Sequence, residues 1–461
     1  SNPLSALGAV YSTETNTAVY GPLRKLTVDV WNAWVGVVGV NGAYGQQLQE
    51  LGKVETQEQL NGIIEKYAYG YDVKAAREIA GTLATQGGSA GGYVGRMDGG
   101  VVTSGQAHDI KLVTAYRSSG GFVGEMSSAG VANVGGITIG DLDVVGSLPV
   151  LQTFVPVIKT SSAYGYRSGA TILANGTDLK NQQGNAGGFA GIIIGGQIEG
   201  KEGNFCSIEK LKTVKGTNTI GGFVGSILSG SAAEVNIGSN DGLLPILLKP
   251  ILGNPDKLAS LLNATVSTIK YAKVDAWDNW GITIDGRYQK ENDPNTQYTY
   301  ASGGFAGNMS GAVLGDKDSN SDSLIVNNIR KVIGGEHVGG FFGLADVAAV
   351  AEVGDNASNG ILGLIKLGEL DVLDAFRTYI YHASVRGSTE HGLIVSANTQ
   401  NEAGGFESTV QTGNAGGFGG SLLNGSVKNA SVTNLNQVNA LNYSGGFIGH
   451  LGKSGVVDLD K

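Results

Sequence analysis

Hydrophobic and polar positions in this chain repeat around a short glycine motif. Gly-Gly-aromatic-x-Gly occurs eight times, with phenylalanine after the glycine pair in seven copies and tyrosine in one. The copies lie at residues 91–95, 120–124, 187–191, 221–225, 303–307, 339–343, 416–420 and 445–449. Short steps of 29 to 36 residues alternate with long steps of 67 to 82 residues, so the repeating unit is a pair of motifs. An internal period of this kind predicts an architecture of stacked units.

The short step indicates what each unit contains. A segment of 29 to 36 residues accommodates three short strands and three bends, which make one turn of a parallel β-solenoid. Glycine lets neighbouring backbones approach closely, and neighbouring strands lie about 4.8 Å apart. The sequence therefore predicts an all-β fold, a parallel β-helix with short helical inserts. We expect it to be right-handed, because parallel crossovers between strands are right-handed. Its core is expected to contain one stacked aromatic ladder made of Tyr93, Phe122, Phe189, Phe223, Phe305, Phe341, Phe418 and Phe447.

The motif spacing also predicts the domain organisation. We expect an N-terminal cap or leading half-coil over residues 1–44, because an open strand edge at the end of a stack invites aggregation. A β-solenoid of four two-coil repeats is expected over residues 45–461, with the repeats at 45–140, 141–237, 238–353 and 354–461. The chain starts at Ser1-Asn2-Pro3 without methionine, so we expect a fragment of a longer protein with flanking domains.

Segments between the motifs predict further elements. Each short step is expected to begin a strand after a turn, and the long steps share a β-prone segment near residues 68–71, 163–166, 269–274 and 379–385. Helical inserts are predicted at 56–67, from a Thr56/Gln59 capping box, and at 255–264, after Asn254. Beyond residue 67 helix propensity competes with the repeat register, which favours extended structure. Apolar inserts at 60–64, 148–156, 243–248 and 361–365 are expected to pack along one flank of the solenoid or to form a partner-binding ridge. An incomplete copy of the glycine motif at 404–408 predicts a bulge or an added hairpin.

The eight motif copies, each followed by a small-residue turn and a Val/Ile strand, resemble the glycine-rich repeats of large bacterial surface proteins and adhesins. The nearest pattern is the GLUG-type repeat, although this chain has Phe or Tyr where that repeat usually has Leu. The resemblance covers residues 86–461. It implies a secreted or wall-attached, extracellular, adhesin-like stalk of a Gram-positive bacterium, and it implies no catalytic residues.

Composition excludes several function classes. A net charge of −9, without a cluster of Lys and Arg, argues against a nucleic-acid or anionic-membrane surface. No apolar run reaches about 18 residues, so no transmembrane helix and no membrane insertion are predicted. The single cysteine, Cys206, cannot form an internal disulfide and is expected in the core. The five histidines lack metal-site spacing and are expected at the surface or in turns.

One segment has the spacing of a calcium loop. Oxygen ligands stand at alternate positions in Asp316, Asp318, Asn320 and Asp322. However, Ser321 occupies the place of the usual turn glycine, and Asn327 occupies the place of the closing glutamate. The alternatives are therefore a calcium site and a plain solvated turn, and no other cofactor is expected.

A second segment combines aromatic and acidic side chains. The candidate ligand-binding residues are Asp275, Trp277, Asp278, Trp280 and Tyr288, with Asp285 and Arg287 nearby. Carbohydrate enzymes use paired carboxylates, so this segment has three interpretations: packing of the tryptophans against the insert at 255–264, glycan binding, or hydrolysis. The function expected from the whole sequence is a non-enzymatic surface adhesin or rigid stalk that binds a host or microbial glycan or protein. The alternative is a β-helix enzyme, a glycoside hydrolase or polysaccharide lyase.

Overall fold

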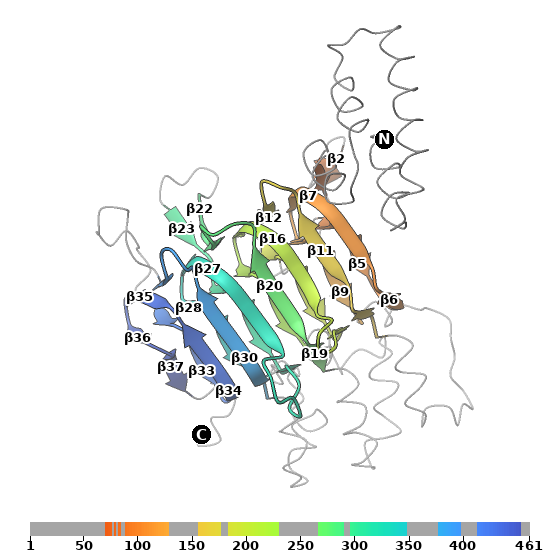
Figure 1. Ribbon diagram of the computed structural model, residues 1–461. Helices are drawn as coiled ribbons and strands as arrows, with labels where there is room; N and C mark the ends of the chain where they lie inside the picture. The colour runs from red at the N-terminus through yellow and green to blue at the C-terminus, as the bar shows by residue number, and fades with distance from the viewer. Residues whose placement is uncertain are drawn as a thin grey trace, which may run out of the picture. The chain divides into compact units, whose positions relative to one another are not determined.

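The computed structural model describes ten segments of the chain (Figure 1). They are residues 70–75, 78–79, 82–83, 88–128, 155–176, 183–229, 266–289, 296–347, 377–397 and 413–452. The chain divides into two compact units, Ser1–Tyr71 and Asp72–Lys461, and the described strands lie almost entirely in the second. Within the described residues this second unit is all-β and contains no helix, as the sequence predicted for its class.

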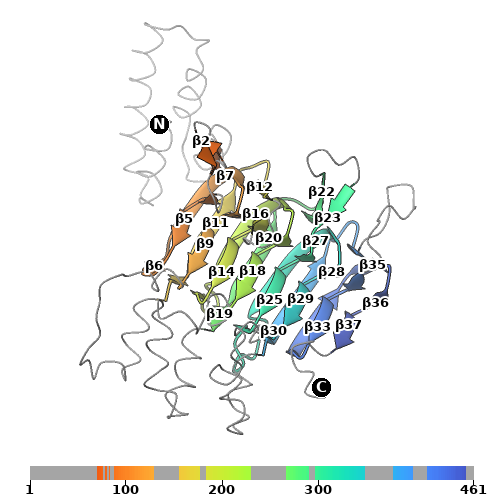
Figure 2. The same ribbon diagram turned by 180° about the vertical axis from the view of Figure 1, so that it is seen from behind.

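Two parallel sheets of eight strands are made by the glycine motifs, and each sheet keeps the order of the chain (Figure 2). The first sheet consists of β4 (Ser89–Gly91), β8 (Ser118–Gly120), β13 (Asn185–Gly187), β17 (Thr219–Gly221), β24 (Ala301–Gly303), β28 (His337–Gly339), β32 (Asn414–Gly416) and β36 (Tyr443–Gly445). The second sheet consists of β5 (Val94–Met97), β9 (Val123–Ser127), β14 (Ala190–Ile194), β18 (Val224–Leu228), β25 (Ala306–Ser310), β29 (Phe342–Asp346), β33 (Gly419–Leu423) and β37 (Ile448–Gly452).

The strands between motifs form a third, larger parallel set. It contains β1 (Tyr71–Lys74), β6 (Val101–Thr103), β7 (Gln106–Ala115), β10 (Val157–Lys159), β11 (Ser162–Gly165), β12 (Ala170–Ala174), β15 (Gln197–Glu199), β16 (Cys206–Lys215), β19 (Ser267–Lys270), β20 (Ala272–Ala276), β21 (Ile282–Asp285), β26 (Ala312–Leu314), β27 (Leu324–Gly334), β30 (Tyr379–Gly387), β31 (Leu393–Ala397), β34 (Ser426–Thr433) and β35 (Leu435–Ala440). Two short antiparallel hairpins, β2 (Glu78–Ile79) with β3 (Thr82–Leu83) and β22 (Arg287–Gln289) with β23 (Thr296–Tyr298), stand apart from it.

One passage of the chain through these sheets is called a layer here, and the described residues contain eight. Layers 1 to 8 comprise the described residues within 71–97, 101–127, 157–194, 197–228, 267–310, 312–346, 379–423 and 426–452. Layers 2 to 7 each pair with the layer before and the layer after, because each strand's parallel neighbours come from adjacent passages. A side chain is therefore surrounded by the equivalent side chains of two other motif copies.

The glycine motifs stack in register, which confirms the predicted aromatic ladder. The first glycine of each copy pairs with the first glycine of the next, from Gly91 with Gly120 to Gly416 with Gly445. The eight rings follow one another at centroid distances of 4.6 to 4.9 Å with nearly parallel planes. The six inner rings, from Phe122 to Phe418, are fully buried. Stacked rings at this spacing add attraction beyond the area that they bury.

Several other predicted elements are confirmed. Strands β6, β15, β26 and β34 begin after turns in the short steps, and β11, β19, β20 and β30 occupy the shared segment of the long steps. Strand β1 supports the extended prediction beyond residue 70. Cys206 is buried, and burial raises the pKa of its thiol to about 11. The predicted cap at 1–44, the helices at 56–67 and 255–264, most of the apolar inserts and the incomplete copy at 404–408 lie outside the described residues.

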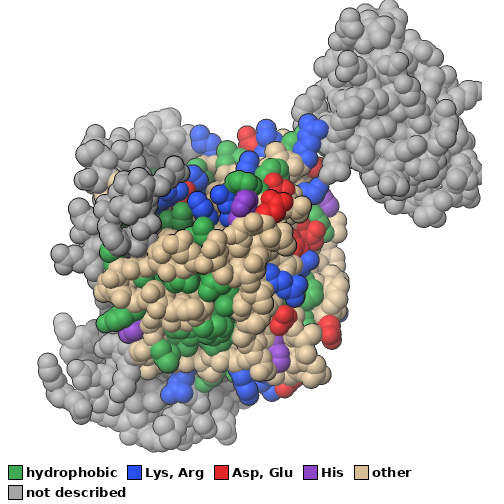
Figure 3. Space-filling view, turned by 60° about the vertical axis from the view of Figure 1, so that its left-hand side comes forward, with side chains coloured by type: hydrophobic (Ala, Val, Ile, Leu, Met, Phe, Trp, Pro, Cys, Tyr) green, Lys and Arg blue, Asp and Glu red, His purple; other side chains and the backbone are tan. Residues whose placement is uncertain are grey.

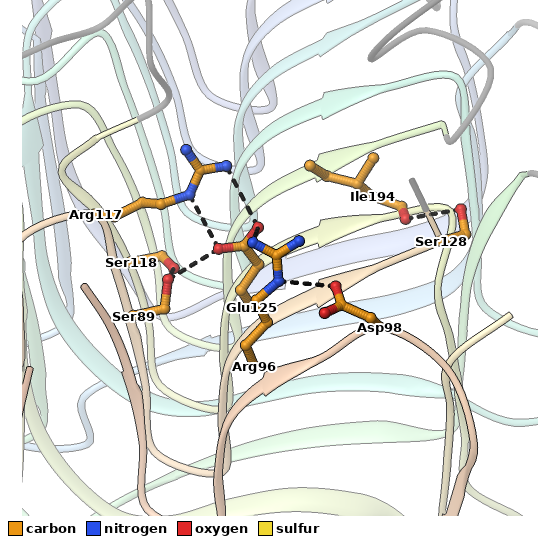
Figure 4. A network of polar contacts seen from close by, with 8 residues as sticks. All are labelled: Ser89, Arg96, Asp98, Arg117, Ser118, Glu125, Ser128 and Ile194. Carbon is orange, nitrogen blue, oxygen red and sulfur yellow. Dashed lines mark hydrogen bonds and ion pairs between the residues drawn. The ribbon is translucent and has the colours of Figure 1, made fainter. Parts of the chain in front are cut away.

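A buried ion pair joins the first two layers, and the sequence reasoning missed it (Figure 4). Glu125 is 2% exposed, and its carboxylate lies 3.0 Å from Nε of Arg117 and 3.7 Å from a guanidinium nitrogen of Arg96. Ser89 Oγ donates a hydrogen bond to Glu125 at 2.9 Å. Buried charge is tolerated only when it is paired and hydrogen-bonded. Arg96 and Glu125 stand at the same position of two consecutive motif copies, where the third layer has Ile192, so opposite charges at one repeat position were the available signal.

The last described layer has its inner side chains partly open to solvent. Tyr443, Phe447 and Leu451 are 55%, 37% and 73% exposed, whereas Phe418 in the layer beneath is fully buried. Figure 3 shows hydrophobic side chains gathered in the middle of this end of the described structure. In the part of the chain that the structure describes, no helix is long and apolar enough to span a membrane.

Candidate ligand-binding corner

Three loops protrude at one corner of the third strand set. They are residues 166–169, 277–281 and 388–392, in layers 3, 5 and 7. The even-numbered layers turn the same corner with single residues of positive φ, which are Asp109, Lys210, Asn328 and Asn434. We call the three loops and these four bends the loop corner. Each loop ends in a glycine of positive φ (Gly169, Gly281 or Gly392), a conformation in which other residues are strained.

The two tryptophans predicted to bind a ligand both lie at the loop corner, but their rings pack against layers on opposite sides. Trp277 contacts the layers below: Nζ of Lys212 lies 4.9 Å from a ring centroid, and the ring lies against Gly169, where an added Cβ would be 2.8 Å from the indole. Trp280 contacts the layers above. Its ring lies 3.9 Å from the guanidinium carbon of Arg330, and the His391 ring meets it edge-on at 4.4 Å. Trp280 remains 47% exposed.

Hydrogen bonds between layers hold the central loop in place. Oδ1 of Asp278 accepts from the backbone N–H groups of Trp280 at 3.0 Å and Gly281 at 3.3 Å, a turn that preorganises the indole. From the layer above, Asn328 Nδ2 donates to the Asp278 carbonyl at 2.5 Å. From the third loop, Ser388 Oγ donates to the Asn279 carbonyl at 3.2 Å. The indole therefore sits on a fixed scaffold, which lowers the entropic cost of binding a ligand.

The predicted cluster is divided between two corners. Asp275, on β20 just before the loop, pairs with Lys273 and accepts a hydrogen bond from Asn327 Nδ2 at 2.8 Å. Asp285 ends the four-residue strand β21, about 13 Å along the chain from the loop at the rise of a β-strand, and Arg287 and Tyr288 follow it in β22. The structure thus brings together Asp275, Trp277, Asp278 and Trp280, but not the remaining three.

The second corner has its own buried ion pair. Asp285 is 7% exposed, and Arg287 donates to its two carboxylate oxygens at 2.8 and 3.1 Å. Burial favours the neutral acid, but the hydrogen bonds and charge of Arg287, with Lys215, hold the pKa of Asp285 below its ordinary value. Burial raises the pKa of Tyr288. Asp285 is thereby held ionised in a structural pair, and Tyr288 is half-buried in the hairpin, where it pairs with Gln297.

The carboxylates of the predicted calcium loop each have a different protein partner. Asp316 accepts from the Tyr271 hydroxyl at 3.0 Å and from the Asp318 backbone at 3.2 Å. Asp318 pairs with Lys317 at 3.1 Å, and Asp322 lies 3.9 Å from Arg386. Among the described residues, no group of three or more His, Cys, Asp or Glu side chains is arranged to hold a metal ion. Asn320 is the fourth predicted ligand of this loop.

Removal of calcium tests this loop. We expect EGTA and added calcium to leave the melting temperature unchanged, since protein donors already hold the carboxylates of Asp316 and Asp322 apart. Thermal melting of the purified chain with each additive measures this. A rise in melting temperature with calcium that the Asp318→Ala variant abolishes would establish a calcium site at this loop.

His337 differs from the prediction that all histidines are surface or turn residues. Its side chain is 14% exposed and lies between layers, where Nδ1 is 2.8 Å from Ser421 Oγ. The Tyr300 ring packs against it at 5.2 Å. Burial, with a smaller effect of His450, lowers the pKa of His337 to about 4. By contrast, His382 does occupy a bend, with φ of +48°.

The His337 environment predicts acid sensitivity. Because the pKa falls from 6.5 in the unfolded chain to about 4 in the folded chain, the unfolded state binds the proton first as pH drops. This stabilisation is complete above pH 6.5 and decreases as the pH falls to about 4, by about 3 kcal/mol in total. Denaturant unfolding of the unmodified chain and of His337→Gln across this range measures it. Equal pH slopes for the two proteins would contradict the assignment.

The loop corner has the chemistry of a recognition surface: a half-exposed indole, two cations against aromatic rings and short amide side chains. Aromatic faces bind the apolar face of a sugar ring, while amides and cations bind its polar groups. Compared with known proteins, this chain matches no family model, no curated protein and no solved structure. The geometry of its own residues therefore has to support any function proposed for it.

Proposed function

We propose that the second unit forms a right-handed parallel β-solenoid and that this protein is a non-enzymatic stalk or adhesin module of a bacterial cell surface. It presents a binding surface to a host or microbial glycan or protein. One observation carries this proposal: the unbroken ladder of eight aromatic rings, which extends through all eight described layers.

The ladder supports a mechanical role, because each further layer that stacks on it lengthens the protein without widening it. Each layer pairs only with its neighbours, so stability accumulates along the stack as it does in other repeat proteins. Fully buried rings and parallel backbone pairing on every side resist bending. Such a stack holds the side chains at its outer corners at a constant spacing, which suits a spacer or an adhesin.

The loop corner supports the binding half of the proposal. Trp280 is half-exposed although the layers around it are closely packed, and Asp278 and Asn328 hold its loop in one conformation. An exposed aromatic ring on a rigid scaffold is typical of a recognition site. The same carboxylates that suggested hydrolysis in the sequence are engaged here: Asp278 by its own loop and Asp275 by Lys273.

A binding panel tests the proposal. The purified chain is incubated with immobilised mucins, plant and microbial glycans and matrix proteins, and both retained protein and released sugar ends are measured. Retention without release is expected. Release of sugar ends would overturn the non-enzymatic assignment, and Asp275, Asp278 and Asp285 would then be substituted. No retention by any partner would contradict the binding role.

A further inference from the structure

Aromatic rings and cations are paired repeatedly along the loop corner. Lys212 lies over Trp277 at 4.9 Å and Arg330 over Trp280 at 3.9 Å. In the loop of layer 3, the guanidinium of Arg167 lies 5.1 Å from the Tyr166 ring. In the two tryptophan pairs the ring comes from the long loop of layer 5, and the cation comes from a neighbouring layer that has only a one-residue bend. The alternation of long and short corners thus places a cation beside each indole.

The positive charges of Lys212 and Arg330 are not neutralised by neighbouring carboxylates. Within the described ranges neither residue forms an ion pair, and each makes its contact with an indole ring. The carboxylates beside the two tryptophans in sequence have other partners, since Asp278 accepts from its own loop and Asp275 pairs with Lys273. In the third loop, the carboxylate of Glu390 lies 3.8 Å from His391 Nε2. Lys212 and Arg330 therefore place two positive charges beside the indoles, on a chain of net charge −9.

Resting on the proposed function, we infer that the loop corner binds a linear acidic polysaccharide lying parallel to the stacking direction. A sugar ring packs on the exposed part of Trp280, and its carboxylate or sulfate groups pair with Arg330 and Lys212. The polymer is linear because the contacts of Trp277 and Trp280 extend from Gly169 in layer 3 to His391 in layer 7. These layers follow one another at less than 5 Å, so one extended chain crosses several of them.

The charges favour a glycan over a nucleic acid. A duplex carries one negative charge per about 1.7 Å of axis, and binding it requires many phosphate contacts from Lys and Arg. Two cations beside two indoles match a polymer that carries an anion on only some of its sugar rings. The net charge of −9 repels denser polyanions while leaving this local attraction intact at short range.

Glycan affinity electrophoresis of the full chain tests the inference, with hyaluronan, polygalacturonate and heparin as acidic probes and dextran as the neutral one. Retardation by at least one acidic probe is expected, weakened by salt, without retardation by dextran. Arg330→Gln and Lys212→Gln are each expected to weaken binding about tenfold, and Trp280→Ala by at least as much. Lys159→Gln removes an exposed lysine that is paired with Glu199 away from this corner, and it should bind normally. Trp280→Phe, which keeps an aromatic ring, should retain most of the binding.

The outcomes separate the inference from the proposed function. Salt-insensitive retardation that is equal for dextran and the acidic probes would overturn the acidic-glycan inference and leave an adhesin. Binding only to a matrix protein in the panel would do the same. Acidic-glycan binding that survives Arg330→Gln, Lys212→Gln and Trp280→Ala, with melting curves unchanged, would place the site elsewhere and overturn the inference.

Discussion

Gly222→Ala is expected to prevent layers 4 and 5 from stacking, whereas Gly446→Ala should change the stability of the protein only a little. A Cβ at residue 222 would lie 1.9 Å from the carbonyl oxygen of Gly304, well inside any real contact. The backbone there cannot retreat, because the N–H of Phe223 donates to the Phe305 carbonyl at 2.8 Å. Gly446 has the same place in its motif, but an added Cβ there meets nothing within 4 Å.

The loss of stability expected for Gly222→Ala is large because the added Cβ would meet a backbone atom, the carbonyl oxygen of Gly304. A flexible side chain could move aside, but a carbonyl in a parallel ladder moves only if its hydrogen bonds break. We expect Gly222→Ala to cost about 3 kcal/mol or more, or to abolish folding, and Gly446→Ala to cost about 1 kcal/mol at most. Urea unfolding followed by circular dichroism measures both. Equal midpoints for the two variants would contradict the close approach of layers 4 and 5.

Phe223→Ala is expected to lower stability by about 3–5 kcal/mol, the cost of removing a fully buried phenylalanine. The Phe223 ring is 0% exposed and lies between Phe189 at 4.7 Å and Phe305 at 4.9 Å. Its removal leaves a cavity inside the ladder and ends the stacking on both sides. Tyr93, at the amino-terminal end of the ladder, is the matched control, because its side chain is 49% exposed and stacks only on Phe122 among the described rings.

Denaturant unfolding of both variants measures the difference. Tyr93→Ala is expected to cost about 1 kcal/mol, since less area leaves water and one stacking contact is lost. Phe223→Leu should recover part of the loss by filling the cavity with apolar volume. A Tyr93→Ala cost as large as that of Phe223→Ala would show that the ladder does not derive its stability from burial.

The local sequence predicted much of the candidate ligand-binding site, but it did not predict that the residues are divided between two corners of the fold. Trp277 and Trp280 stood out because aromatic and acidic residues are crowded into their segment, and both lie at one corner. Tyr288 looked equally close, at 8 residues from Trp280. However, the intervening strand β21 carries it to the next corner. Lys212 and Arg330 were missed, since they come from neighbouring layers and only the register between layers places them against the indoles.

What the sequence determined by itself is the repeat: the motif period, the parallel stacking of identical glycines and the aromatic ladder. These follow locally, because a Gly-Gly pair and a large ring recurring at one position can be buried only against their own copies. The tertiary structure alone decided which individual residues of different layers meet. Glu125 is buried because Arg117, Arg96 and Ser89 surround it, and His337 is held neutral because it lies between layers. Such neighbours are set by the register between passages of the chain, and loops of unequal length conceal that register in the linear sequence.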